Sequence, residues 1–351
     1  MRSFVYESLP VRVVFGAGGL DQLPVEVERL GYRRALVLAT SRTRAEGVVE
    51  QLGRLAVGVF DRAVMHVPME TAQSARAEAR RLDADVTVAV GGGSTIGLAK
   101  ALALDSNLPI LAIPTTFSGS EMTPIWGLTE AGVKRTGRNV KVLPRTVIYD
   151  PTLTLTLPPA VAGPSGMNAI AHGVEALYAE NANPITSLMA EEAISALATS
   201  LPTIAAKPGD IGAHTTAFYG SWLAGTCLST VGMALHHKLC HTLGGSFGLP
   251  HAETHTIVLP HATAYNADAA PEAMQRVARA LGAHRAASGL YELARRLGAP
   301  AALKDIGLKA ADLDRAAQLA TENPYYNPRP VTRDGVRALL EQAFHGRPPD
   351  G

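Results

Sequence analysis

Polar residues at helical spacing are the part of this sequence best suited to chemistry. His237 and His241 are four residues apart, and Asn168 and His172 repeat that spacing. His251 follows a proline and begins another helical stretch. Residues four apart share one face of a helix, so each pair presents its side chains to a common centre. The pattern predicts a reaction centre or a metal site built from several helices.

Other histidines are interpreted as ordinary hydrogen-bonded residues of the core or the surface. That interpretation suits an isolated histidine, but seven of the eleven histidines lie between residues 214 and 261. Because histidines are concentrated in this segment, the histidines at helical spacing are interpreted as site residues instead. The ordinary interpretation applies to His66, His214, His236, His255, His261, His284 and His345.

A second candidate site is a glycine-rich turn that follows the apolar run 86–90. The turn consists of Gly91, Gly92, Gly93, Ser94 and Thr95. Where a strand leads through glycines into a helix, backbone N–H groups and the helix dipole favour a phosphate, and glycine permits its close approach. Ser94 or Thr95 could cap the helix or bind a phosphate oxygen. An ordinary tight turn is the alternative, since the pattern is not GxGxxG.

Hydroxyl groups after a later strand could serve the same ligand. They belong to Thr115, Thr116 and Ser118. Together the two turns predict a dinucleotide site for NADH or NADPH. The strand that ends near Thr40 carries no Asp or Glu, and such a carboxylate usually binds the ribose hydroxyls of NAD. The choice between the two nucleotides therefore stays open.

Two halves of the chain differ in pattern. Residues 1–156 alternate apolar, β-branched runs with amphipathic stretches, which predicts a doubly wound, largely parallel α/β dinucleotide-binding domain. Residues 157–351 show helix after helix and predict an all-helical catalytic domain. Expected strands are 11–15, 35–39, 57–60, 86–90, 110–113 and 140–149. Expected helices of the second domain are 165–182, 186–201, 210–231, 233–246, 252–267, 271–281, 285–297, 310–321 and 332–344.

Bulk composition excludes several classes of protein. The formal net charge is +1, and charged residues make up 18% of the chain, so we expect neither nucleic acid nor a membrane surface as partner. No apolar run reaches the length of a membrane helix, and we expect neither a membrane helix nor a signal peptide. Cys227 and Cys240 are expected to be free thiols, and the protein is expected to be cytoplasmic.

Longer motifs resemble the iron-containing, group III alcohol dehydrogenase family over nearly the whole chain. They are GGGSTIGLAK at 91–100, PTTFSGSEMT at 114–123, GMNAIAHGVEALY at 166–178 and HHKLCHTLGGSFGLPH at 236–251. The resemblance implies a dinucleotide-binding domain, an all-helical domain and a cleft between them. In the family pattern an Asp and three His hold a divalent metal, and the matching positions are Asn168, His172, His237 and His251. His241 matches a nearby active-site histidine.

Two departures from that pattern resemble the maleylacetate-reducing branch of the family. Asn168 stands where the ligand Asp would be, and Gly97 stands where the glycine loop usually has Asp. The resemblance implies reduction of the carbon–carbon double bond of maleylacetate to 3-oxoadipate, in aromatic-compound degradation. It also implies a homodimer. The alternatives are a metal-dependent alcohol or aldehyde dehydrogenase, a dehydroquinate synthase-like lyase, and a nucleotide-binding protein without activity.

Replacing Asp by Asn raises the charge of a metal site by one unit and removes its only anionic ligand. Asn binds a hard cation more weakly, so we expect no tightly bound metal; His172, His237 and His251 would be its ligands otherwise. Protonation and charge stabilisation are assigned to His241 and His251, with Asn168, His172 and His237 completing the pocket. A dicarboxylate substrate also needs cations. The candidates are Lys134, Arg135, Lys238 and Arg329.

Overall fold

Two compact units make up the chain in the computed structural model, which describes residues 3–130 and 133–349. The first unit spans residues 9–157. The second combines residues 158–349 with residues 3–8, a grouping that the sequence did not predict. Each unit is described by itself.

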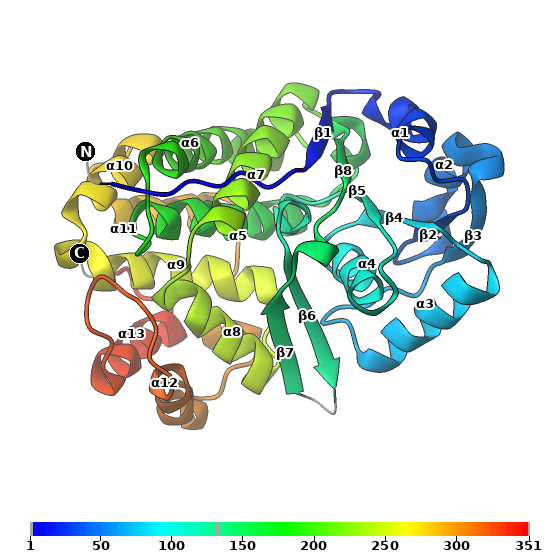
Figure 1. Cartoon of the computed structure of the whole chain (residues 1–351). Helices are drawn as coiled ribbons and strands as arrows, with labels where there is room; N and C mark the ends of the chain where they lie inside the picture. The colour runs from blue at the N-terminus through cyan, green and yellow to red at the C-terminus, as the bar shows by residue number, and fades with distance from the viewer. Residues whose placement is uncertain (1–2, 131–132, 350–351) are drawn as a thin grey trace. The chain divides into compact units, whose positions relative to one another are not determined.

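A six-stranded parallel sheet forms the centre of the first unit, as predicted (Figure 1). Its strand order is β1-β8-β5-β4-β2-β3. The strands are β1 (Arg12–Phe15), β2 (Ala35–Leu38), β3 (Ala56–Phe60), β4 (Val86–Gly91), β5 (Ile110–Pro114) and β8 (Thr146–Tyr149). The helices are α1 (Leu23–Arg29), α2 (Arg42–Leu52), α3 (Met69–Arg81) and α4 (Gly93–Ser106).

Helices cover both faces of this sheet, which explains the continuous apolar character of its central strands. β2, β4, β5 and β8 are buried along their whole length. Leu23 and Val27 of α1 and Val48 and Leu52 of α2 share one core with the sheet. α3 and α4 lie against the opposite face (Figure 1). The predicted doubly wound α/β class is therefore confirmed.

An antiparallel hairpin in the first unit was not predicted. β6 (Ile125–Glu130) pairs with β7 (Val133–Arg138), so two of the candidate cations, Lys134 and Arg135, lie in a strand. The strand expected over residues 140–149 is also shorter, because only Thr146–Tyr149 pairs. Pro144 precedes that strand, and proline cannot donate a ladder hydrogen bond.

Helices alone form the regular structure of the described residues 158–349, as predicted. They are α5 (Pro159–Leu177), α6 (Pro184–Ala206), α7 (Ile211–Thr230), α8 (Leu235–Phe247), α9 (His251–Asn266), α10 (Pro271–Leu281), α11 (Ala286–Arg296), α12 (Leu313–Thr321) and α13 (Arg333–His345), with short 3-10 turns. Cys227 and Cys240 are buried and form no disulfide. Across the residues that the structure covers, no helix has both the length and the apolar character needed to span a bilayer.

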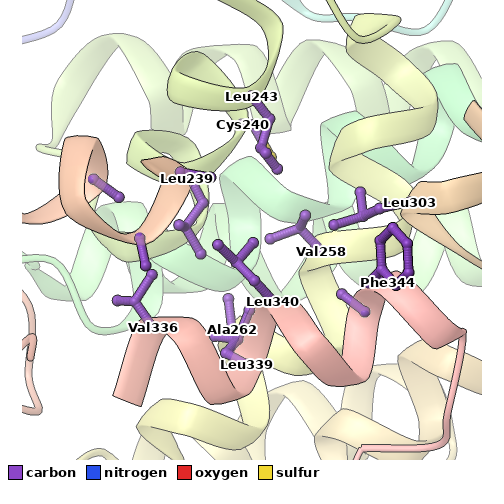
Figure 2. Packing of buried hydrophobic residues seen from close by; sticks show 14 of the residues in the cluster. Leu239, Cys240, Leu243, Val258, Ala262, Leu303, Val336, Leu339, Leu340 and Phe344 are labelled. Carbon is purple, nitrogen blue, oxygen red and sulfur yellow. The ribbon is translucent and has the colours of Figure 1, made fainter. Parts of the chain in front are cut away.

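The apolar face of α8 decides where its histidines point. Leu239, Cys240 and Leu243 of α8 pack with residues of α9 and α13 in one buried cluster, as Figure 2 shows. Because one side of α8 is committed to this core, His237 and His241 lie on a different side of the helix. Burial of the leucines therefore fixes the rotation of α8 about its axis.

Candidate active site

Three helices of the second unit bring the polar residues of the predicted centre together. α5 contributes Asn168 and His172, α8 contributes His237 and His241, and α9 begins at His251. The ring centres of His172 and His237 are 5.1 Å apart, and those of His237 and His241 are 6.2 Å apart. Histidines from separate helices thus form one group, which we call the histidine cluster.

The histidine cluster also includes two residues that the sequence interpretation had set aside. The ring of His255 lies 4.3 Å from that of His251 and 5.1 Å from that of His237. The ring of His236 lies 4.8 Å from that of His255. Both residues are completely buried. The ordinary interpretation was wrong for His255, because neither ring nitrogen has a hydrogen-bond partner among the described residues. Its four-residue spacing from His251 was the available signal.

Several buried polar atoms of the histidine cluster, and one of Asn168 on α5, lack a hydrogen-bond partner within the described part of the chain. Besides those of His255, they are Oδ1 of Asn168, Nδ1 of His172, Nδ1 of His236 and Nε2 of His237. An unsatisfied buried polar atom costs about 1–3 kcal/mol, so such atoms rarely persist in one place without a function. A bound water, substrate or cation would satisfy them.

Glu175 of α5 holds the start of α8 and was missed by the sequence analysis. Its carboxylate is completely buried. It accepts hydrogen bonds from the backbone N–H of Ala234 at 2.8 Å and of His236 at 2.7 Å. Its Oε2 also lies 2.7 Å from Nδ1 of His237. Glu175 lies three residues after His172, on the same helix face, and that spacing could have revealed it.

Burial keeps the innermost histidines neutral. Desolvation lowers the pKa of His237 to about 3 and that of His236 to about 4. The same cause, with neighbouring histidines adding to it, holds the pKa of His172 and of His255 well below 6.5. Burial also raises the pKa of Glu175. The carboxylate of Glu175 favours protonation of His236, but desolvation outweighs this attraction in both partners.

The two histidines assigned to proton transfer lie nearer the surface. His241 is exposed and His251 is half-buried. Both therefore have access to solvent protons, whereas the buried rings of His172 and His237 do not. This difference in burial separates residues that can exchange a proton from residues that shape the pocket.

Donor atoms suited to a divalent metal are present, and all of them are neutral. Asn168, His172, His237 and His251 supply one amide oxygen and imidazole nitrogens, which fit a transition metal. His236, His237 and His255 form a second overlapping set, whose ligand atoms lie within 4.8 Å of one another. The nearby carboxylate of Glu175 is occupied by three donors. Among the described residues, only this second set brings three His, Cys, Asp or Glu ligand atoms so close together. The predicted set of His172, His237 and His251 therefore has suitable chemistry for a metal but not this spacing, and neither set includes a charged ligand.

The glycine turn of the first unit leaves the start of α4 open. Gly92 is the N-cap of α4, and no side chain caps the helix. Of the two roles predicted for Ser94 and Thr95, capping is therefore excluded, and binding of a phosphate oxygen stays a prediction. Gly91 has φ +151°, and a Cβ there would lie 2.5 Å from Oγ1 of Thr95. A Cβ at Gly93 would have no described atom within 4 Å. The first glycine is thus required by the fold, and the third leaves space for a ligand.

The two hydroxyl-bearing turns lie side by side. β4 and β5 are neighbours, and the backbone N–H of Thr115 donates to the carbonyl of Gly91 at 3.1 Å. A Cβ at Gly92 would lie 2.9 Å from Cγ2 of Thr116. Ser118 accepts a hydrogen bond from Ser120. Both turns therefore lie at the carboxyl edge of the sheet, where ligands of parallel sheets bind. Thr40 is exposed just beyond β2, the other neighbour of β4.

Buried Lys100 of α4 forms hydrogen bonds with the segment that follows the turn at Thr115–Ser118. Its ammonium donates to the carbonyl of Ser120 at 2.7 Å, to the hydroxyl of Thr123 at 2.9 Å and to the carbonyl of Ile125 at 2.9 Å. Burial lowers the pKa of Lys100 to about 7. Three acceptors around one amine hold α4 and this turn in a common frame.

The predicted cations for a dicarboxylate differ in their surroundings. Arg329 stacks over the ring of Tyr265 at 4.3 Å and donates to its carbonyl at 3.1 Å, which is a structural role. Arg135 pairs with Glu130 across the hairpin. Lys238 is half-buried, with its amine 5.8 Å above the ring of Tyr325. The side chain of Lys134 lies outside the described residues.

Comparison with known proteins places this arrangement among its relatives. A family model described as iron-containing alcohol dehydrogenase matches residues 10–151, and the model of the C-terminal part of the Fe-containing alcohol dehydrogenase family matches residues 163–344. A maleylacetate reductase from Burkholderia cepacia is 56% identical over 348 residues, covering 99% of each chain. One from Sphingobium indicum is 57% identical over the same length and coverage.

Solved structures agree with the sequence relatives. The crystal structure of maleylacetate reductase from Agrobacterium tumefaciens is 52% identical, with a TM-score of 0.95, covering 99% of this chain and 100% of that chain. The structure of an iron-containing alcohol dehydrogenase from Corynebacterium glutamicum is 45% identical, with a TM-score of 0.94, covering 100% and 98%.

Proposed function

The chain belongs to the iron-containing alcohol dehydrogenase family, and we propose that within it this protein is a maleylacetate reductase. It reduces the carbon–carbon double bond of maleylacetate to 3-oxoadipate with NADH or NADPH. The single observation that carries this proposal is the full-length likeness to several enzymes of that name. Asn168, at the position of the family's ligand Asp, supports it.

Chemistry of the reaction assigns different tasks to the exposed and buried histidines. A nicotinamide bound at the two turns would supply a hydride for the carbon β to the ketone of the substrate, and negative charge would then develop on the ketone oxygen as an enolate. Hydrogen-bond donors at that oxygen lower the barrier, and a proton must reach the α-carbon. We assign these tasks to His241 and His251, because their solvent access lets them take up and release protons. Buried His172, His237 and Asn168 shape the pocket.

We also propose that catalysis needs no tightly bound metal. If a divalent metal is bound, Asn168, His172, His237 and His251 would hold it, and it would supply a positive charge beside the developing enolate. The ligand set is neutral, and the buried carboxylate of Glu175 already accepts three hydrogen bonds. A neutral set binds a hard cation more weakly than one with a carboxylate.

Cofactor binding is proposed at the two turns of the first unit. The pyrophosphate would lie at the uncapped start of α4, near Gly92, Gly93 and Thr116. Exposed Thr40 offers no carboxylate to repel a 2′-phosphate, so NADPH is permitted beside NADH. A homodimer in the cytoplasm remains the predicted assembly and location.

A substrate panel tests the proposal. Purified protein is mixed with NADH or NADPH, and the nicotinamide absorbance is followed with maleylacetate, simple alcohols and aldehydes. Among these compounds, we expect only maleylacetate to support oxidation of the nucleotide, whether or not a chelator is present. Metal-dependent turnover of alcohols or aldehydes would favour the alcohol dehydrogenase alternative instead. Loss of maleylacetate reduction on chelation would refute the metal-free proposal but not the substrate.

A further inference from the structure

We infer that Glu175 is a positioning residue, which fixes His237 in the tautomer that carries its proton on Nδ1 and presents the lone pair of Nε2 to the histidine cluster. The inference rests on the proposed function for its catalytic consequence only. Its structural basis is independent of any substrate and lies entirely within the second unit.

Two backbone N–H groups orient the carboxylate of Glu175 independently of His237. Ala234 donates to Oε2 at 2.8 Å and His236 donates to Oε1 at 2.7 Å, so each oxygen has a fixed backbone partner. Ala234 is the N-cap of α8, and its methyl group cannot accept a hydrogen bond from the backbone of the first turn. A buried carboxylate from α5 therefore replaces the usual local cap, and it cannot rotate without leaving an N–H unpaired.

This fixed carboxylate determines which nitrogen of His237 is protonated. Oε2 lies 2.7 Å from Nδ1 of His237, and a carboxylate oxygen that already accepts from Ala234 acts as an acceptor here too. While Glu175 is ionised it can only accept, so Nδ1 carries the proton and donates it. The other nitrogen, Nε2, is then a bare acceptor, and it is buried without a partner among the described residues.

The orientation matters for the site because of what lies next to His237. Its ring is 5.1 Å from that of His172, which has an unpartnered buried Nδ1 of its own. Asn168, whose buried Oδ1 is also without a partner among the described residues, lies about one turn before His172 on α5. A lone pair at Nε2 can accept from a water or ligand, or bind a cation, whereas an N–H there could not bind a cation. Carboxylate–histidine pairs of this kind orient the imidazole and are worth about 10- to 100-fold in activity or metal affinity.

Simple helix capping is the competing explanation, and the two roles predict different results for Glu175→Gln. An amide cannot accept from all three donors, so α8 is weakened in either case. Placed beside Nδ1, the amide N–H₂ would donate to His237 and move the proton of the imidazole to Nε2. A purely structural cap would leave the tautomer unchanged. Asp210→Ala is the matched control, because Asp210 caps α7 of the same unit by accepting from Ala213 at 2.9 Å.

The experiment measures imidazole nitrogen chemical shifts by NMR in protein labelled with ¹⁵N-histidine, and kinetics in parallel. The His237 signals are assigned by their loss in His237→Asn. We expect wild type to show protonated Nδ1, Glu175→Gln to show protonated Nε2, and kcat per folded molecule to fall about 10- to 100-fold while the KM for NADH changes little. Asp210→Ala should keep wild-type kcat and tautomer.

Two results would overturn the inference. One is a wild-type His237 with its proton on Nε2, which can be measured even if Glu175→Gln does not fold. The other is a folded Glu175→Gln with unchanged tautomer and kcat. Because the tautomer is measured without substrate, wild-type inactivity toward maleylacetate would refute the proposed function and leave this inference standing.

Discussion

Val67 fills the space beside Gly97 in the first turns of α4: a Cβ at residue 97 would lie 2.9 Å from Cγ2 of Val67. Val67 is buried, and its φ of 45° is unusual for a β-branched residue. The neighbouring hairpin holds this turn, since Thr129 donates its N–H to the carbonyl of Val67 at 3.1 Å. A larger side chain at position 97, such as the Asp of the family pattern, therefore has no room.

Gly97→Ala is expected to destabilise the first unit through this contact. The added methyl overpacks the site and should lower the free energy of unfolding by about 1–3 kcal/mol, measured by urea unfolding. Shortening the opposing side chain in Gly97→Ala/Val67→Ala should recover most of the difference between Gly97→Ala and wild type. The steric explanation is incorrect if the double variant loses as much free energy of unfolding as the two single variants lose together.

Gly93→Ala separates nucleotide binding from a simple tight turn. Nothing described lies within 4 Å of the new Cβ, and alanine is a better helix former than glycine, so stability should be equal or slightly higher. The methyl would occupy the space proposed for the pyrophosphate, and the Kd for NADH should rise roughly tenfold or more. Fluorescence titration of NADH measures this. Unchanged affinity would favour the ordinary-turn interpretation.

Asn168→Asp tests the charge of the histidine cluster. A carboxylate at this buried position adds an anionic oxygen ligand, so we expect affinity for Zn²⁺ or Fe²⁺ to rise by about tenfold or more. Calorimetric titration of chelator-treated protein measures the change. Asn183→Asp is the matched control, because Asn183 is equally buried, at 4% exposure, but caps α6. Equal metal binding by Asn168→Asp and wild type would contradict the account of residue 168.

The buried histidines predict loss of stability in acid. The pKa of His237 is lowered to about 3 and that of His236 to about 4, while His172 and His255 are also shifted downward from 6.5. Below about pH 6.5 the unfolded chain takes up protons that the folded chain does not. Each such histidine therefore costs up to about 1.4 kcal/mol per pH unit, until the pH reaches its folded pKa.

Urea unfolding of chelator-treated protein from neutral pH to about pH 5 measures this loss. Glu175 acts in the opposite direction, since its raised pKa lets the folded state bind a proton, and it offsets one histidine at most. Replacing buried His255 by Phe should reduce the slope by up to one proton. A free energy of unfolding independent of pH over this interval would show that the cluster protonates freely.

Local pattern was sufficient to predict the sheet, the helices and the shared helix faces of the candidate site residues. Apolar runs such as β4 and β5 read as strands because both faces are covered, and Asn168–His172 and His237–His241 share a helix face by spacing alone. The β6–β7 hairpin was missed because its pairing depends on contacts between strands, while the sequence around Trp126 and Gly137 carries no clear alternation.

What the sequence by itself determined were the residue types, the periodicities and the motifs that relate this chain to its family. Only the tertiary structure decided that His236 and His255 join the cluster, that Glu175 reaches residues about sixty positions away, and that Val67 packs against Gly97. The contacts of the histidines and Glu175 depend on how α5, α8 and α9 are rotated about their axes, and the contact of Val67 depends on how the segment before α3 packs against α4. Helix rotation and depth of burial are set by long-range packing, and they decide which polar group is desolvated and which partner it meets.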